Sequence, residues 1–302
     1  MKTEKAEALW PVDVWKRIEE AVADESQHIK IAEKFLPKHR PMAEARTVPS
    51  ERIRHAEGKF FIDEAPVTPL LELWSEFELT RQQVAREAEL GTARTLARRA
   101  ANILAQAEDT MIFQGLQSLE TETLFRDTRA LQRSGPAMVG LLNAVESVEQ
   151  VIEMPALGSE AVAGLPILDA ATPKFGEFTF EAVSQAYVRL QEKEHHGPYA
   201  LVLPPLPFAD TQAALPQTLL RPAERIHHLL QSTPLSTSHL PSLSGVLVSL
   251  GGSTLELVVG QEPEATFMFE DAEGKYHFRV WERFALRIKD QTAIVRLDFK
   301  VE

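Results

Sequence analysis

A single helical pattern spans Arg81 to Gln114 and directly follows an extended stretch of chain. Its apolar residues recur at spacings of three, four or multiples of four, as expected for one face of an α-helix. They are Val84, Ala88, Leu96, Ala100, Leu104, Ala107 and Met111. Such a helix is far longer than the mean of about 11–12 residues, and Gly91 marks a point at which it can break. An extended stretch that leads into so long a helix is unusual for a compact enzyme.

The segments before this pattern predict one more helix, an arm and two extended stretches. Apolar residues fall near helical spacing over Pro11 to Ile29. Three prolines interrupt Phe35 to Ser50, so we expect an arm or linker there. Lys59–Asp63 and Leu70–Leu79 are expected to be extended, with Thr80 as the cap of the long helix.

The second half of the chain predicts a mixture of helices and strands. Helices are expected at Phe180–Glu194 and Pro222–Gln231. Strands are expected at Ala200–Leu203, Gly245–Leu250, Thr254–Val259, Thr266–Phe269, Tyr276–Phe284 and Ala293–Phe299. Gly251-Gly252 is a hairpin signal between the second and third of these strands. The order of elements therefore predicts an α+β fold.

The composition excludes several classes of protein. The chain has no cysteine, so it has no disulfide, thiolate metal site or cysteine nucleophile, and a cytoplasmic location is expected. Its formal net charge of −12 disfavours a sequence-independent hold on nucleic acid, which needs concentrated Lys and Arg. Met1 to Trp10 lacks the apolar core of a signal peptide, and no stretch approaches ~20 uninterrupted apolar residues. We therefore expect neither nucleic acid nor a membrane as a partner.

The sequence holds none of the common catalytic motifs. Phosphate-binding loops, dinucleotide fingerprints, H-E-x-x-H and G-x-S-x-G are all missing. The spacing Glu-x-x-His, which places both side chains on one helical face, occurs at Glu25/His28, Glu192/His195 and Glu224/His227. Three such pairs are a modest excess over chance, and the further glutamates of a di-iron bundle are not evident. We expect no enzyme activity and no metal, and keep a histidine–carboxylate metalloenzyme as an alternative.

Five stretches of the sequence, taken in order, resemble a known family. They are Pro69-Leu-Leu-Glu-Leu73, Ala107-Glu-Asp-Thr-Met-Ile-Phe-Gln-Gly115, Gly140-Leu-Leu142, Gly197-Pro-Tyr-Ala-Leu-Val-Leu203, and Val246 to Gln261 followed by His277 to Asp290. These are similar to hallmark stretches of encapsulin shell proteins of the family 1 type. The resemblance spans about Trp15 to Asp298. Each stretch is weak alone, but five in the right order are fairly specific.

The resemblance implies a fold and a division of the chain. Encapsulins have the tailed-phage major-capsid-like fold, with an N-terminal helix, an extended loop, a long spine helix, a peripheral β-sheet and an apical domain. Here it implies the N-terminal helix and arm at 1–50, the extended loop at 51–80, and the peripheral domain with the spine helix at 81–140. Residues 141–245 are then mainly apical, and 246–302 form a C-terminal β-sheet that completes the peripheral domain.

The resemblance also implies a function. Encapsulin subunits self-assemble, in multiples of sixty, into an icosahedral nanocompartment. It encloses a cargo enzyme whose short terminal targeting peptide binds the inner wall. Typical cargoes are ferritin-like proteins, peroxidases and hemerythrin-like proteins. This chain is accordingly expected to be a shell subunit rather than an enzyme.

Two sets of contact residues follow from the resemblance. The family's cargo-peptide groove lies between the N-terminal helix and the closing sheet, which corresponds here to Trp15, Ile18, Val22 and Phe35. The same residues are also consistent with ordinary packing of a helix on a core. The pore-lining loop of the family corresponds to 215–221, where Thr218 and Arg221 are the polar candidates.

A third set lies in the extended loop. Because such a loop cannot bury its apolar residues alone, Phe60, Phe61, Leu71 and Leu73 are expected to pack on neighbouring subunits. The alternative is that they belong to core strands of a monomer.

The sequence departs from the family at two places. The basic-aromatic segment after the N-terminal helix survives only as Lys34-Phe35, before a proline-rich run. Some family members hold a flavin on an aromatic residue where this chain has Gln82, so we expect no flavin or other cofactor. A phage or prophage major capsid protein, which shares the fold and packages DNA, is the main alternative function. It would usually carry a scaffolding or cleaved extension, which we do not expect here.

Overall fold

The computed structural model describes residues 9–41, 45–121, 125, 131–135, 137–145, 147–155, 176–214 and 220–300. Its helices are α2 (Val12–Ile29), η1 (Ala32–Lys34), α3 (Arg81–Ala85), α4 (Glu87–Leu90), α5 (Thr92–Gln114), α6 (Ser118–Thr121), η2 (Val148–Gln150), α8 (Gly176–Glu192), α9 (Pro205–Gln212), α10 (Pro222–Leu230), η4 (Gly251–Ser253) and η5 (Gln291–Ala293).

The strands fall into two five-stranded sheets and two two-stranded ones. They are β1 (Lys38–His39), β2 (Thr47–Pro49), β3 (Arg52–Ala56), β4 (Lys59–Asp63), β5 (Val67–Pro69), β6 (Leu71–Thr80), β7 (Gln132–Ser134), β8 (Val151–Pro155), β9 (Tyr199–Leu203), β10 (Leu235–Ser236), β11 (Ser244–Ser249), β12 (Leu255–Glu270), β13 (Lys275–Ile288) and β14 (Ile294–Lys300).

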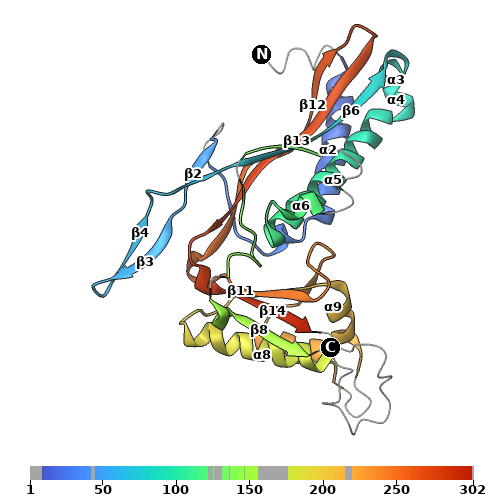
Figure 1. Cartoon of the computed structure of the whole chain (residues 1–302). Coiled ribbons are helices and arrows are strands. Elements are labelled where there is room, and N and C mark those ends of the chain that lie inside the picture. The colour runs from blue at the N-terminus through green and yellow to red at the C-terminus, as the bar shows by residue number, and fades with distance from the viewer. Residues whose placement is uncertain are drawn as a thin grey trace.

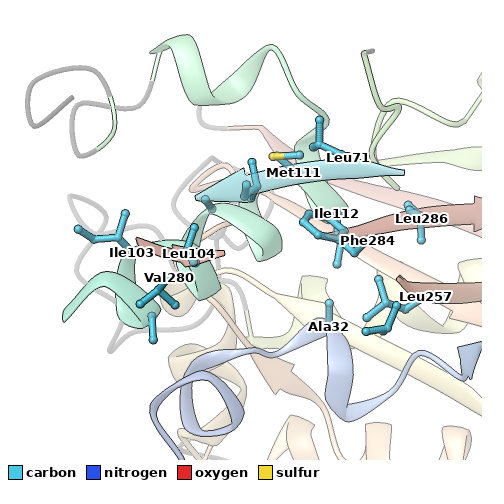
Figure 2. Close-up of a cluster of buried hydrophobic side chains, with 14 of the residues drawn as sticks. Ala32, Leu71, Ile103, Leu104, Met111, Ile112, Leu257, Val280, Phe284 and Leu286 are labelled. Carbon is cyan, nitrogen blue, oxygen red and sulfur yellow. The ribbon is translucent and has the colours of Figure 1, made fainter. Parts of the chain in front are cut away.

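The first large sheet has the strand order β1-β12-β13-β6-β7 and carries helices α2 and α5 on one face (Figure 1). Strand β13 pairs antiparallel with both β12 and β6. Because side chains alternate along a strand, Phe278, Val280, Phe284 and Leu286 of β13 all point to the helix-covered face, where they are buried. Figure 2 shows this core, in which Ile103, Leu104, Met111 and Ile112 of α5 lie with Val280 and Phe284.

The long helical pattern is divided into three helices rather than one. Thr80 caps α3 in a capping box with Gln83, as the sequence predicts for its cap. The chain then turns at Gly91, whose φ of 61° lies in the left-handed region that favours glycine. Thus the break at Gly91 is confirmed, and α5 alone, with 23 residues, is the long spine of this part.

The second large sheet has the order β10-β9-β11-β14-β8 and is covered by α8 and α10 on one face. All residues of β9 are buried, which confirms the predicted buried strand. Leu201 and Leu203 pack beneath α8, whereas Ala200 and Val202 join the apolar core between the first sheet and its helices α2 and α5. Both faces of the second sheet are therefore covered. The first part of the protein, built on the first sheet, and the second part, built on the second sheet, share one continuous apolar contact.

Two expectations about the last sixty residues are wrong. Gly251-Gly252 does not close a hairpin, because β11 belongs to the second sheet and β12 to the first. For the same reason residues 246–302 do not form one sheet, since β14 returns to pair with β11 and β8. The chain crosses between the sheets at η4 and again at η5. Alternating apolar residues identified these strands but carried no information on which neighbour each would pair with.

Among the described residues, no helix combines the length and the apolar character needed to cross a membrane.

Candidate functional site

The hairpin of β3 and β4 carries three adjacent exposed apolar residues, Phe60, Phe61 and Ile62. Its two strands pair with each other, with Ile53 opposite Ile62 and His55 opposite Phe60. The hairpin extends away from both large sheets (Figure 1). The exposed fractions are 77% for Phe60, 47% for Phe61 and 55% for Ile62. An isolated two-stranded hairpin is only marginally stable in water, and contiguous exposed apolar residues mark interaction surfaces. The hairpin therefore presents a contiguous apolar surface to its surroundings.

The root of this hairpin is held by ion pairs to the first sheet. Arg287 of β13, 2% exposed, pairs with Glu256 and donates to Glu51 Oε1 at 2.9 Å and to the carbonyl oxygen of Pro49 at 2.8 Å. Lys289 Nζ lies 2.5 Å from the second oxygen of Glu51. Partial burial raises the pKa of Glu51, but Lys289 and Arg287 outweigh it and hold the pKa below its usual value. The hairpin therefore leaves the body of the protein in a fixed direction.

A groove of about 740 Å³ lies beside the hairpin. One wall is apolar and includes Ile53, Phe60 and Ile62 of β3 and β4. The opposite wall is polar and includes His195 and Asp290, which lie 3.7 Å apart between the end of α8 and η5. Burial lowers the pKa of His195, against the opposing effect of Asp290. The groove thus joins the hairpin to the edge of the second part.

The four residues expected at the subunit interface separate into two kinds. Phe60 and Phe61 are exposed, but Leu71 and Leu73 are only 1% and 0% exposed. Both leucines point from β6 into the core shared with α5, and Figure 2 shows Leu71 beside Met111. Leu71 and Leu73 therefore belong to a core strand, which is the alternative that the sequence left open.

The residues expected in a cargo groove lie mostly in the core. Trp15, Ile18 and Val22 are 8%, 2% and 0% exposed on the face of α2 that packs on α5 and β13. Phe35 is half-buried and stacks on Phe113 with 6.4 Å between ring centroids. Of the four, Phe35 offers the most surface to a ligand.

The other candidate residues are the pore candidates and the Glu-x-x-His pairs. Thr218 falls outside the described residues, and Arg221 is the exposed residue that precedes α10. Of the histidine pairs, His195 contacts Thr292 Oγ1 at 2.7 Å, and Glu25 accepts from Asn102 at 2.7 Å. Within the described part of the chain, no group of three or more His, Asp or Glu side chains is placed to share a metal ion.

A buried charge cluster that the sequence analysis missed joins α2, α5 and β13. Lys30, which follows α2, is 2% exposed. Its Nζ lies 2.5 Å from Glu108, 2.8 Å from Glu282 and 3.1 Å from Glu33. Burial lowers the pKa of Lys30, but these three carboxylates outweigh it and keep the pKa well above its usual value. The signal in the sequence was Glu108-Asp109 within the apolar run from Ala107 to Phe113 of α5.

Asp109 provides a second link at the same junction. It is fully buried and accepts hydrogen bonds from the backbone N–H groups of Ile31 and Ala32. Burial raises the pKa of Asp109 to about 7, although these hydrogen bonds favour the ionised form. The turn that leads into η1 is therefore held by a side chain of the spine helix.

The fold matches solved structures of capsids and capsid-like particles. The virus-like particle from Pyrococcus furiosus aligns with a TM-score of 0.62 and 18% identity, covering 95% of this chain and 100% of that one. The encapsulin SrpI from Synechococcus elongatus aligns with a TM-score of 0.58 and 12% identity, over 90% and 88% of the two chains. The capsid of Myoviridae phage XM1 gives a TM-score of 0.58 and 12% identity, over 90% and 92%. The predicted tailed-phage capsid fold is confirmed.

The fold is thus that of the tailed-phage capsid class of proteins. The chain belongs to the Linocin_M18 family, described as "Encapsulating protein for peroxidase", whose pattern matches residues 4–153 and 162–285. This confirms the predicted encapsulin relationship. The type 1 encapsulin shell protein EncA of Myxococcus xanthus is 31% identical over 134 residues, which are 44% of this chain and 45% of that protein. The match therefore spans less than half the length of this curated relative.

Proposed function

We propose that this chain is the structural subunit of an icosahedral nanocompartment that self-assembles and encloses a cargo enzyme. The β3–β4 hairpin is the observation that carries the proposal. A projection that is both apolar at Phe60, Phe61 and Ile62 and rigidly rooted through Arg287 needs a complementary surface. In a homo-oligomer a neighbouring copy supplies that surface. Family membership supports a shell as the form of the assembly.

The proposal also covers the number of subunits, their location and the role of each domain. A closed icosahedral shell of this chain contains subunits in multiples of sixty and lies in the cytoplasm. The part built on α2, α5 and the first sheet corresponds to the peripheral domain, and the part built on the second sheet to the apical domain. The chain itself performs no catalysis, and the chemistry belongs to the cargo.

Assembly is tested on the purified full chain by electron microscopy and light scattering. Uniform closed particles are expected. The variant Phe60→Asp places a charge in the apolar contact and is expected to lower the assembled fraction by about tenfold or more. Lys59→Ala, at an exposed polar position of the same hairpin, is the matched control and should assemble normally. Wild-type protein that stays monomeric, or a Phe60→Asp variant that assembles as wild type does, contradicts the proposal.

We further propose that the cargo's targeting peptide binds along α2 near Phe35, with Trp15, Ile18 and Val22 supporting the helix from beneath. The half-exposed ring of Phe35 on Phe113 supports this position. A peroxidase is the first cargo to test, given the description of the family; ferritin-like and hemerythrin-like proteins are the other candidates. Phe35→Ala should lower the amount of co-purified cargo without changing particle assembly. Normal cargo loading in this variant would place the peptide elsewhere.

The segment that contains Thr218 and Arg221 is proposed to line a pore at a symmetry axis. The exposed position of Arg221, directly before α10, supports this. Arg221→Glu is expected to change the rate at which a small anionic substrate reaches enclosed cargo, whereas the rate with free cargo stays the same. Equal rates for both shells would argue against the pore.

A further inference from the structure

The charge cluster around Lys30 contains three carboxylates but only two ammonium groups, those of Lys30 and Lys38. An ammonium group has three N–H donors, and Glu33, Glu108 and Glu282 together occupy all three. Lys38, at the rim, adds a second cation but contacts Glu33 alone among these three. The two deepest carboxylates, Glu108 and Glu282, therefore depend on Lys30 for their only charged partner among the described residues.

Two oxygen atoms in this cluster lack a donor. Glu108 Oε1 and Glu282 Oε1 are buried and have no hydrogen-bond partner among the described residues. Their side chains are 2% and 1% exposed, and both carboxylates contact the same Nζ atom, so they are close neighbours. Two ionised carboxylates in this arrangement repel each other and leave two buried acceptors unsatisfied. One bound proton would end this repulsion and would turn one of the two acceptors into a donor.

We propose that Glu108 and Glu282 bind one proton between them, through the two oxygens that lack donors, and that this buried proton-binding site fastens the end of α2 to α5 and β13. The inference concerns the folded chain itself and does not depend on the proposed shell function.

The surrounding charges favour a proton at Glu108. Burial raises the pKa of Glu108 well above its usual value, and the nearby Glu282 and Glu33 raise it further, against the opposing effect of Lys30. The groups that face the site are Lys30 from the end of α2, Glu33 from η1 and Glu282 from β13, with Asp109 next to Glu108 on α5. Lys38 of β1 reaches the cluster through Glu33.

The site makes the stability of the junction depend on pH. Because the folded state keeps a proton that the unfolded chain releases near the usual glutamate pKa of 4.5, its stability falls as pH rises from that value to the folded pKa. Each extra bound proton changes the folding equilibrium constant by about tenfold per pH unit in this window. Above the folded pKa, two ionised carboxylates face each other at the base of the 30–36 segment, which we expect to loosen.

Infrared spectroscopy of the full-length protein tests the site directly. A protonated carboxyl group gives a C=O stretching band that an ionised carboxylate does not. At pH 7 the band should be present, and its shift when glutamate is labelled with carbon-13 distinguishes it from any band of Asp109, whose pKa is about 7. Absence of a labelled band at pH 7 overturns the proposal; a water molecule that bridges two ionised carboxylates would give that result.

Matched variants identify the residues. In Glu108→Gln the carboxamide donates to Glu282 as the carboxyl does, so this variant should fold, lose the band and lose the extra dependence of stability on pH. Glu282→Gln should do the same. Glu273→Gln, the same change at an exposed turn, should keep both. A band that persists in both Glu108→Gln and Glu282→Gln overturns the assignment. If either variant fails to fold, the other and the wild-type band decide.

Discussion

The carboxylate of Asp109 on the spine helix α5 lies 2.7 Å from the backbone nitrogen of Ile31, in a segment that precedes it by 78 residues. Its other oxygen lies 3.0 Å from the nitrogen of Ala32. A buried N–H group that loses its acceptor costs about 1–3 kcal/mol. We therefore expect Asp109→Ala to lower the free energy of unfolding by about 2–4 kcal/mol, measured by urea denaturation with tryptophan fluorescence. Asp109→Asn, which keeps one acceptor oxygen, should cost less than Asp109→Ala. A loss below about 0.5 kcal/mol for Asp109→Ala would mean that the cap is energetically unimportant.

Asp109 should also make stability depend on pH between about 4 and 7. Its pKa is raised from 3.8 to about 7, so the folded state holds a proton that the unfolded chain has released. The stabilisation is complete below the unfolded value and is lost as pH rises through the folded one. Relative to Asp109→Asn, the wild type should lose up to about 1.4 kcal/mol per pH unit within this range. Parallel stability profiles of the two proteins would contradict the assignment.

Gly140 lies against the end of α5 with no room for a side chain. A Cβ atom there would come within 2.2 Å of the backbone nitrogen of Gly115 and 2.6 Å of the carbonyl carbon of Gln114. Because backbone atoms cannot move aside, Gly140→Ala should cost about 3 kcal/mol or more in unfolding free energy. Gly58→Ala is the comparison, since φ there is +73° but the space is open. That change should cost about 1 kcal/mol, and equal effects of the two changes would refute the steric argument.

Glu87 should stabilise the start of the spine helix. It is 4% exposed, and its two carboxylate oxygens accept from the backbone nitrogens of Ala93 at 2.7 Å and Arg94 at 3.1 Å. Removal of such a cap costs about 0.5–2 kcal/mol, so Glu87→Ala should lower the unfolding free energy by about that amount. The exposed Glu89 of the same short helix is the control, and Glu89→Ala should change stability by less than about 0.5 kcal/mol. Equal losses for the two variants in thermal or urea denaturation would contradict the capping role of Glu87.

Arg287 should couple stability to assembly. Its removal leaves Lys289 as the remaining cation beside Glu51 and Glu256, a change that costs up to about 3 kcal/mol. Since the same residue fixes the root of the β3–β4 hairpin, Arg287→Met should reduce assembly even at temperatures where the subunit stays folded. Circular dichroism and light scattering on the same sample separate the two effects. A folded Arg287→Met variant that assembles fully would show that the hairpin needs no fixed direction.

Periodicity predicted most of the elements because helices and strands repeat at different intervals. The N-terminal helix, β4 and α10 lie within a residue or two of their expected bounds, and the long helical pattern ends at Gln114 as expected but begins as two shorter helices. The pairing of β11, β12 and β14 was not predictable, because a strand's alternating pattern is the same in either sheet. The break before the spine helix was indicated in the sequence by Gly91 alone.

The candidate sites were harder to predict for a physical reason. Trp15, Ile18 and Val22 have helical spacing, which a ligand groove and a core produce equally, and the structure places them in the core. Phe60 and Phe61 are adjacent, so on a strand they point to opposite faces and one core cannot bury both. Leu71 and Leu73 alternate, as a half-buried strand requires. For Lys30 and Glu108, the sequence could only show charges in an apolar run, since their partners are far along the chain.

The crossings between the sheets at η4 and at η5 lie side by side. Thr254, just after η4, offers its carbonyl oxygen to the backbone nitrogens of both Lys289 and Asp290, at 2.8 and 3.1 Å, just before η5. These two covalent connections are therefore tied together by backbone hydrogen bonds where the sheets meet. The apolar core that both sheets share adds to this tie, so a change in the angle between the sheets would have to break both. In a closed particle this angle would be one of the quantities that set the curvature of the wall.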